Sequence, residues 1–125
     1  MPKESVGPAA LMTGAEHFNN QEHFEAHEEW EKVWYGTEGE ENRFLKGLIQ
    51  VAVSLYHLEC GNLSGARKVM STALDYLKGL PPTHSGVDLD RLRLQVLPLF
   101  RELEERRDPY PMVQASPPRI AVRTD

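Results

Sequence analysis

The two histidines of one short segment have the spacing of a metal site. His23 and His27 stand four residues apart, so on a helix both side chains would lie on one face and could reach the same ion. The residue after His23 is Phe24, where the zinc-protease motif requires glutamate, so that motif is excluded. Because His23 stands near the start of the predicted helix, we expect it to be a partly exposed packing residue.

Glu31 is the next residue of this segment that could do chemistry. At about 100° per residue, Glu31 falls inside an apolar arc, between Phe24 and His27, and it stands four residues after His27. A carboxylate paired with an imidazole in apolar surroundings is typical of a general base or a metal ligand. The alternative is a buried pair that satisfies only itself or caps a backbone group.

The helix that follows carries one polar stripe on an otherwise apolar rod. The stripe consists of Arg43, Lys46, Gln50, Ser54 and His57. One interpretation is that this stripe faces water. The other is that Gln50 and His57 face the preceding helix, where they would form a pocket with His27 and Glu31.

Such a pocket would offer ligand types that suit a divalent metal, with His27, Glu31 and His57 as the predicted metal ligands. Di-metal sites in helical bundles normally have more carboxylates, and Glu28 at the edge of the arc is the second candidate. The sequence contains no serine or cysteine in a nucleophile motif and no glycine-rich phosphate loop. No reaction is therefore predicted, and whether the protein is an enzyme stays open.

Hydrophobic spacing predicts four main helices that would position these side chains. They run from about Gly14 to Tyr35 with a break at Asn19-Asn20, from about Glu40 to Cys60, from Leu63 to about Leu77, and from Leu89 to about Leu103. Thr37 and Glu40 have the spacing of a capping box, and Pro98 should kink or split the last helix. Trp30 and Trp34 are both predicted to be largely buried.

The predicted fold class is all-α: a compact multihelical bundle of four to five helices with an extended, proline-rich C-terminal tail. We expect a flexible N-terminal arm over residues 1–12, the bundle over 13–106 and the tail over 107–125. The tail is predicted from its prolines, which favour extended backbone and are Pro109, Pro111, Pro117 and Pro118. The short connection after Tyr35 predicts that the helices on either side of it pack as an antiparallel pair.

Composition limits the classes of function. The chain has 125 residues and a net charge of −5 with both signs mixed, which argues against a nucleic-acid partner. The most apolar stretch, Leu48 to Leu58, is too short to span a bilayer, and the N-terminus lacks a signal-peptide pattern, so we expect a cytoplasmic protein without a membrane partner. Cys60 is the single cysteine, which excludes disulfides, and we expect it to be a small buried residue.

Two blocks of sequence resemble the family known as domain of unknown function 309. The blocks are Phe18-Asn19 with Phe24 to Glu28 and Trp30-Glu31, then Phe44 to Gln50, extended by Tyr56-His57, Gly61-Asn62 and Gly65-Ala66. The resemblance covers about Phe18 to Leu80 and implies a small multihelical bundle without an established activity. It also implies that the family's motif includes Glu25, His27, Glu28, Glu31, Gln50 and His57. In place of His23 and Lys46 the family pattern has an aromatic residue and a glutamine.

Two functions remain open at this point. The first is a small-molecule or metal-binding protein whose pocket lies between the helix of His27 and Glu31 and the helix of Gln50 and His57. The second is a non-catalytic protein-interaction or structural module, in which the apolar helix and the tail serve folding and self-association. An inward His57 near His27 or Glu31 would favour the first, and a large exposed apolar patch would favour the second.

Overall fold

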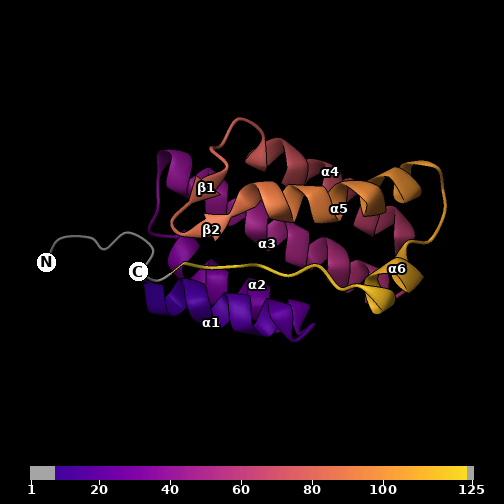
Figure 1. The fold of residues 1–125 in the computed structure, drawn as a ribbon, viewed down its shortest axis with the longest axis horizontal. Coiled ribbons are helices and arrows are strands. Elements are labelled where there is room, and N and C mark those ends of the chain that lie inside the picture. The colour runs from indigo at the N-terminus through magenta and orange to yellow at the C-terminus, as the bar shows by residue number, and fades with distance from the viewer. Residues whose placement is uncertain (1–7, 124–125) are drawn as a thin grey trace, which may run out of the picture.

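The computed structural model describes residues 8–123. Over this range the chain is mostly helical, with six helices and one short hairpin (Figure 1). The elements are α1 (Pro8–Asn19), α2 (His23–Trp34), α3 (Gly39–Glu59), α4 (Leu63–Leu77), β1 (Thr83–His84), β2 (Val87–Asp88), α5 (Leu89–Glu104) and α6 (Tyr110–Ala115). The all-α class predicted from hydrophobic spacing is confirmed. No helix in the described range is both long and apolar enough to cross a membrane.

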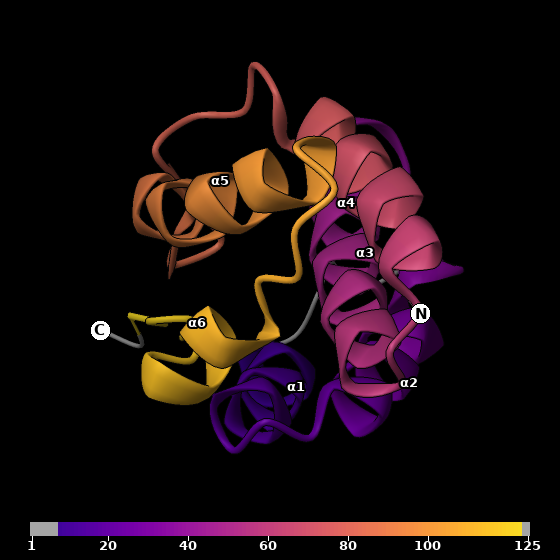
Figure 2. The ribbon, with the colours of Figure 1, turned by 90° about the vertical axis from the view of Figure 1, so that its right-hand side faces the viewer.

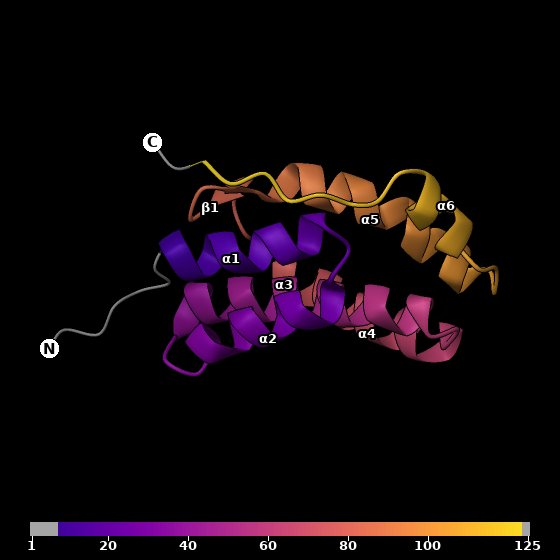
Figure 3. The same cartoon turned by 90° about the horizontal axis from the view of Figure 1, so that it is seen from below.

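The helices follow one another around the bundle. Each of the first four packs against the next one in the chain: α1 on α2, α2 on α3, α3 on α4, and α4 on α5. Figure 2 shows them nearly end-on, and Figure 3 shows α1 and α2 lying along α3. Short connections between neighbouring helices favour this arrangement. The first and last of these five helices, α1 and α5, do not pack against each other in this series. We call the space between them the seam.

The apolar helix predicted from about Glu40 to Cys60 is α3, and it is central to the core. Its buried residues are Phe44, Leu45, Gly47, Leu48, Ile49, Val51, Ala52, Ser54, Leu55 and Leu58. α3 approaches α4 closely at Gly47, where an added Cβ would lie 2.4 Å from Cδ2 of Leu77. The hydroxyl of Ser54 donates a hydrogen bond to the Ala66 carbonyl of α4 at 2.8 Å. One member of the predicted polar stripe therefore faces α4 and not water.

The break predicted at Asn19-Asn20 is confirmed, and a helix-terminating motif accounts for it. The amide of Glu22 donates to the His17 carbonyl at 2.8 Å, and the amide of Gln21 donates to the Phe18 carbonyl at 3.0 Å. Gln21 has a φ of 62°, so these two bonds form a Schellman motif that ends α1. The chain then reverses and enters α2 at His23.

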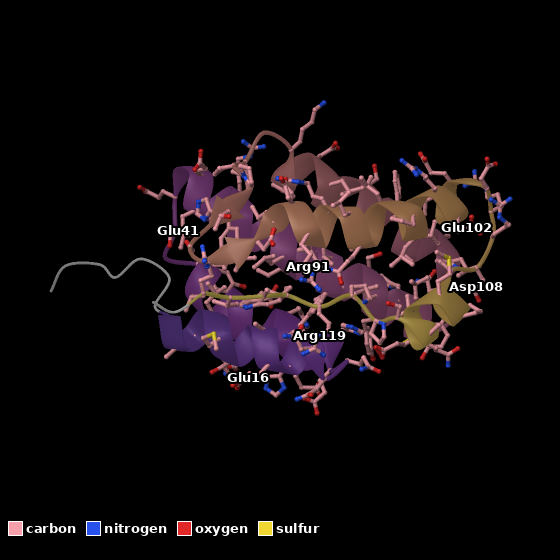
Figure 4. All side chains as sticks on the ribbon, in the orientation of Figure 1. Glu16, Glu41, Arg91, Glu102, Asp108 and Arg119 are labelled. Carbon is pink, nitrogen blue, oxygen red and sulfur yellow. The ribbon has the colours of Figure 1, made fainter. Side chains whose placement is uncertain are left out.

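An extended segment after α6 closes the seam between α1 and α5 (Figure 1). The side-chain amide of Asn19 on α1 donates to the Ile120 carbonyl at 2.9 Å and accepts from the Ile120 amide at 2.7 Å. The side-chain amide of Gln95 on α5 makes the same two bonds with Arg119, each at 2.9 Å. Figure 4 shows Arg119 on this segment, beside α1. Two consecutive residues are thus held from opposite sides, and Ile120 is buried.

The same segment then continues onto the hairpin. Val122 forms an antiparallel bridge with Val87, and the Arg123 amide donates to the Gly86 carbonyl at 2.8 Å. The hairpin lies in the stretch between the third and fourth predicted helices. Its two turn residues, Ser85 and Gly86, have φ values of 49° and 83°, as a two-residue type I′ turn requires.

Three predictions about element boundaries are wrong. Residues 8–12, expected in a flexible arm, belong to α1, and the rest of that arm lies outside the described residues. Residues 110–115, expected in the extended tail, form α6, which prolines at its start permit. Thr37 does not open α3 with a capping box, because its hydroxyl donates instead to the Trp34 carbonyl at the end of α2.

Three predictions about single residues also need correction. Pro98 lies inside α5, which continues through it, so the alternative that Pro98 splits the helix is wrong. Trp30 is fully buried as expected, but Trp34 is only partly buried, with the ammonium group of Lys46 4.4 Å from its ring centroid. Cys60, expected in the core, is exposed at the end of α3. Trp34 and Cys60 lie at the ends of α2 and α3, where the direction of the apolar face is least well defined by sequence.

Candidate functional site

The predicted pair of His27 and Glu31 is present, but it lies at the edge of the bundle. The Nε2 atom of His27 is 3.8 Å from Oε1 of Glu31, and the two side chains are 16% and 39% exposed. The Nδ1 atom of His27 donates to the Phe24 carbonyl one turn back. Glu31 therefore does not enter the core, and its partner imidazole is already anchored to backbone.

The structure does not join the other predicted residues to this pair. Gln50 and His57 are partly buried on α3. The Nδ1 atom of His57 accepts a hydrogen bond from the Asn62 amide at 3.1 Å, which ties the ring to the turn between α3 and α4. Glu25 and Glu28 are exposed on α2. Within residues 8–123, His57 has no hydrogen bond or ion pair with His27 or Glu31.

For a metal at His27, Glu31 and His57, the 3.8 Å approach of His27 to Glu31 is the one feature of this geometry that fits. Within the described part of the chain, no group of three or more histidine, cysteine, aspartate or glutamate side chains is arranged to hold a metal ion. Metal binding by these three residues stays a prediction.

The histidine that does enter the core is His23. It is 2% exposed, and its Nδ1 atom lies 2.7 Å from Oε1 of Glu59, on the last turn of α3. The Phe18 ring packs against the imidazole edge-on, with the ring centroids 5.3 Å apart. The expectation of a partly exposed His23 is therefore wrong. The turn after α1 places this residue against the end of α3, where it is covered.

The pairing with Glu59 determines which nitrogen of His23 carries hydrogen. A carboxylate only accepts hydrogen bonds, so Nδ1 must be the protonated nitrogen that donates to Glu59. In the neutral ring Nε2 then has a free lone pair. The Nε2 atom is buried and has no hydrogen-bond partner among the described residues. A buried polar atom of this kind is uncommon, because it has lost its water without gaining a partner.

A small cavity adjoins this histidine. Its volume is about 120 Å³, and its lining residues are Gln21, His23, Glu59, Tyr110, Val113 and Gln114. Three parts of the chain meet here: the turn between α1 and α2, the end of α3, and α6. The lining combines a carboxylate, an imidazole and two amides with apolar surface. This mixture can hold a small polar molecule and orient it.

Sequence reasoning missed this site although part of the signal was present. The buried residues of α2 are His23, Ala26 and Trp30, spaced i, i+3 and i+7. That pattern identifies His23 as the inward histidine. The sequence prediction instead places both tryptophans in the core, and this choice centres the apolar arc nearer to His27. Glu59 could not have been found this way, since it is 36 residues from His23 and lies on a different helix.

An imidazole held by a carboxylate has a defined chemical capacity. The carboxylate fixes the ring orientation and makes the opposite nitrogen a better acceptor, as it does for histidines that bind metals or take up protons. In His23, a residue of the cavity lining, that opposite nitrogen is Nε2, which is buried and has no hydrogen-bond partner among the described residues.

Comparison with known proteins supports the resemblance seen in the sequence. The family described as Domain of unknown function (DUF309) matches residues 11–69, which comprise most of α1, all of α2 and α3, and the first part of α4. None of the curated proteins matches the chain. The match includes both His23 and Glu59 but ends before α6. Residues 11–69 of this chain are thus similar to the DUF309 family.

Proposed function

We propose that the protein binds a small polar molecule in the cavity beside His23. The observation that carries this proposal is the buried Nε2 atom of His23, which lacks a partner while Nδ1 is fixed by Glu59. A ligand with an N–H or O–H group would supply the missing hydrogen bond. The amides of Gln21 and Gln114 in the cavity lining can bind its remaining polar atoms.

The cavity limits the size of this molecule. Liquid water occupies about 30 Å³ per molecule, so about 120 Å³ has room for roughly four waters. The volume is well below the roughly 300–1,000 Å³ of pockets that enclose drug-sized ligands. We therefore infer a ligand of a few non-hydrogen atoms, such as a small amide, urea or diol.

The test uses two substitutions that separate the two nitrogens of the ring. His23→Asn keeps a donor near the Nδ1 position, which preserves the bond to Glu59, and removes the Nε2 atom. His23→Gln places an amide near the Nε2 position and gives up the bond to Glu59. Amide resonances of wild type and both variants would be recorded by NMR during titration with acetamide, urea and ethylene glycol.

We expect wild type to show saturable shifts at residues around the cavity, including Gln21 and Gln114, and His23→Asn to stay folded without them. Asn20→Ala, an exposed change in the same turn, should titrate like wild type. Equal shifts in wild type and His23→Asn would refute a role for Nε2. Absence of saturable shifts with all three compounds would leave His23 a purely structural residue.

A divalent metal at His27, Glu31 and His57 is the second candidate, since two of its three residues lie 3.8 Å apart. Elemental analysis of purified wild type and Glu31→Gln tests it. Bound metal in wild type and its loss in Glu31→Gln, with an unchanged melting temperature, would support the metal site. A metal-free wild type after growth in metal-rich medium would exclude it.

A further inference from the structure

An aromatic cluster lies exposed on the outer face of α2 and α3. The rings of Phe24 and Tyr56 are 5.2 Å apart, and the ring of His27 lies 4.8 Å from that of Phe24. Phe24 is 43% exposed and Tyr56 is 38% exposed, so this cluster is not part of the core. We call these three side chains the aromatic patch.

Carboxylates surround the aromatic patch. The hydrogen-bonded Cys60 side chain is the main cause that raises the pKa of the Tyr56 phenol, and the negative charges of Glu59 and Glu25 raise it further. Glu31 lies 3.8 Å from His27 on the other side. Glu25 has no ion pair with a basic side chain in the described range. Of these three carboxylates, Glu59 and Glu31 lie beside histidines, and Glu25 is the one without a basic partner among the described residues, so the surface combines exposed rings with unpaired negative charge.

The same two helices already carry one contact between a cation and an aromatic ring. On the neighbouring surface of the same two helices, the ammonium of Lys46 lies 4.4 Å from the centre of the Trp34 ring. A cation is attracted to the face of an aromatic ring, and nearby carboxylates strengthen that attraction. At the aromatic patch the rings and the carboxylates are present, and the cation is not supplied by the described residues.

We propose that the aromatic patch of Phe24, His27 and Tyr56 docks a basic, arginine-containing segment of a partner protein. Arginine suits this surface better than lysine, because its planar group stacks on rings, is weakly hydrated and bonds to carboxylates with two N–H groups. Negative charge disfavours nucleic acid and anionic lipid at the same place, since both present phosphate. This inference is independent of the cavity beside His23.

The experiment measures fluorescence anisotropy of a labelled peptide of alternating arginine and leucine. Matched peptides carry lysine or glutamate in place of arginine. The protein variants are Phe24→Ala, Phe24→Tyr and Glu25→Gln. Tyr35→Ala serves as the control, because Tyr35 is an exposed aromatic residue (76%) that follows the opposite end of α2 and lies outside the aromatic patch.

We expect the arginine peptide to bind most tightly, the glutamate peptide not to bind, and added salt to weaken the complex. Phe24→Ala should weaken binding about tenfold and Glu25→Gln about threefold, whereas Phe24→Tyr and Tyr35→Ala should leave it unchanged. Because Phe24→Tyr keeps the ring and Glu25→Gln changes only an exposed side chain, the test does not depend on Phe24→Ala remaining folded.

Two results would overturn the proposal. If Phe24→Ala, Glu25→Gln and Tyr35→Ala all bind the arginine peptide as wild type does, the attraction reflects only the net charge of −5. If sedimentation shows that wild type forms a dimer at micromolar concentration and Phe24→Ala does not, the aromatic patch is occupied by a second copy of the chain.

Discussion

The indole of Trp30 packs directly against the backbone of α1 at Gly14. A Cβ atom on residue 14 would lie 2.1 Å from Nε1 of Trp30, far inside van der Waals contact. The indole N–H points toward the Leu11 carbonyl, 3.4 Å away, and the whole side chain is buried. Gly14 therefore sets how closely α1 and α2 approach.

Gly14→Ala should destabilise the protein even though alanine is the better helix former. Alanine gains up to about 1 kcal/mol in an exposed helix, but overpacking a rigid core typically costs about 1–3 kcal/mol. We expect a net loss of about 1–2 kcal/mol in urea unfolding. Glu16→Ala, an exposed change on the same helix, should lie within about 0.5 kcal/mol of wild type. A more stable Gly14→Ala would show that α1 can shift without cost.

The amides of Asn19 and Gln95 should be energetically coupled. Each makes two hydrogen bonds with the segment that fills the seam, so Asn19→Ala or Gln95→Ala should cost about 1–3 kcal/mol. Removing either should loosen the whole segment, so the double variant should cost less than the sum of the two. Urea unfolding and hydrogen exchange of the Ile120 amide would measure this. Strict additivity would mean that the two contacts act independently.

Arg106→Gly should stabilise the protein. Arg106 ends α5 in a Schellman motif with a φ of 63°, a conformation that costs residues other than glycine about 1–2 kcal/mol. Gly61 has the matching position at the end of α3, with a φ of 75° and open space where a Cβ would lie. We expect Arg106→Gly to gain about 1 kcal/mol and Gly61→Ala to lose about 1 kcal/mol in thermal unfolding. If both variants are less stable than wild type, the Arg106 side chain makes a stabilising contact that outweighs the backbone strain.

Glu102 should titrate at an unusually low pH. Two hydrogen bonds from Arg107, at 2.8 and 2.9 Å, lower the pKa of its carboxyl group. Since the folded pKa lies below the unfolded value, the pair stabilises the fold above the unfolded pKa, and this contribution is lost as the pH falls through the folded pKa. In an NMR titration, Arg107→Gln should return the Glu102 midpoint toward about 4.3. An unchanged midpoint would refute the pairing in solution.

Local pattern sufficed for the helices of the bundle but not for the regions shaped by distant contacts. The apolar run of α3 and the break at Asn19-Asn20 depend on neighbouring residues, and both could be read from the sequence. α6 could not, because Pro109 and Pro111 favour extended backbone as well as a helix start. His23 is buried because the end of α3 and α6 cover the start of α2. Contacts between such distant parts of the chain leave no local pattern in the sequence.

The site was misassigned for the same reason. His27 and Glu31 have the spacing of an intrahelical pair, which sequence shows directly, and the structure places them 3.8 Å apart at the bundle edge. The pair of His23 and Glu59 joins two helices whose relative rotation depends on how Trp30 packs against Gly14. Because residues four apart differ by only about 40° around a helix, that packing decides which of the two histidines faces inward.

The gap between α1 and α5 can be filled only late in synthesis of the chain. Neighbouring helices can pack as soon as each pair has left the ribosome, but Ile120 meets Asn19 only after 101 further residues have been translated. Until then the segment between α1 and α5 is missing from the nascent bundle. Its apolar interior is therefore accessible to water along that side. During that interval chaperones could bind the exposed apolar surface. The binding of Arg119 and Ile120 between α1 and α5 would then cover that surface.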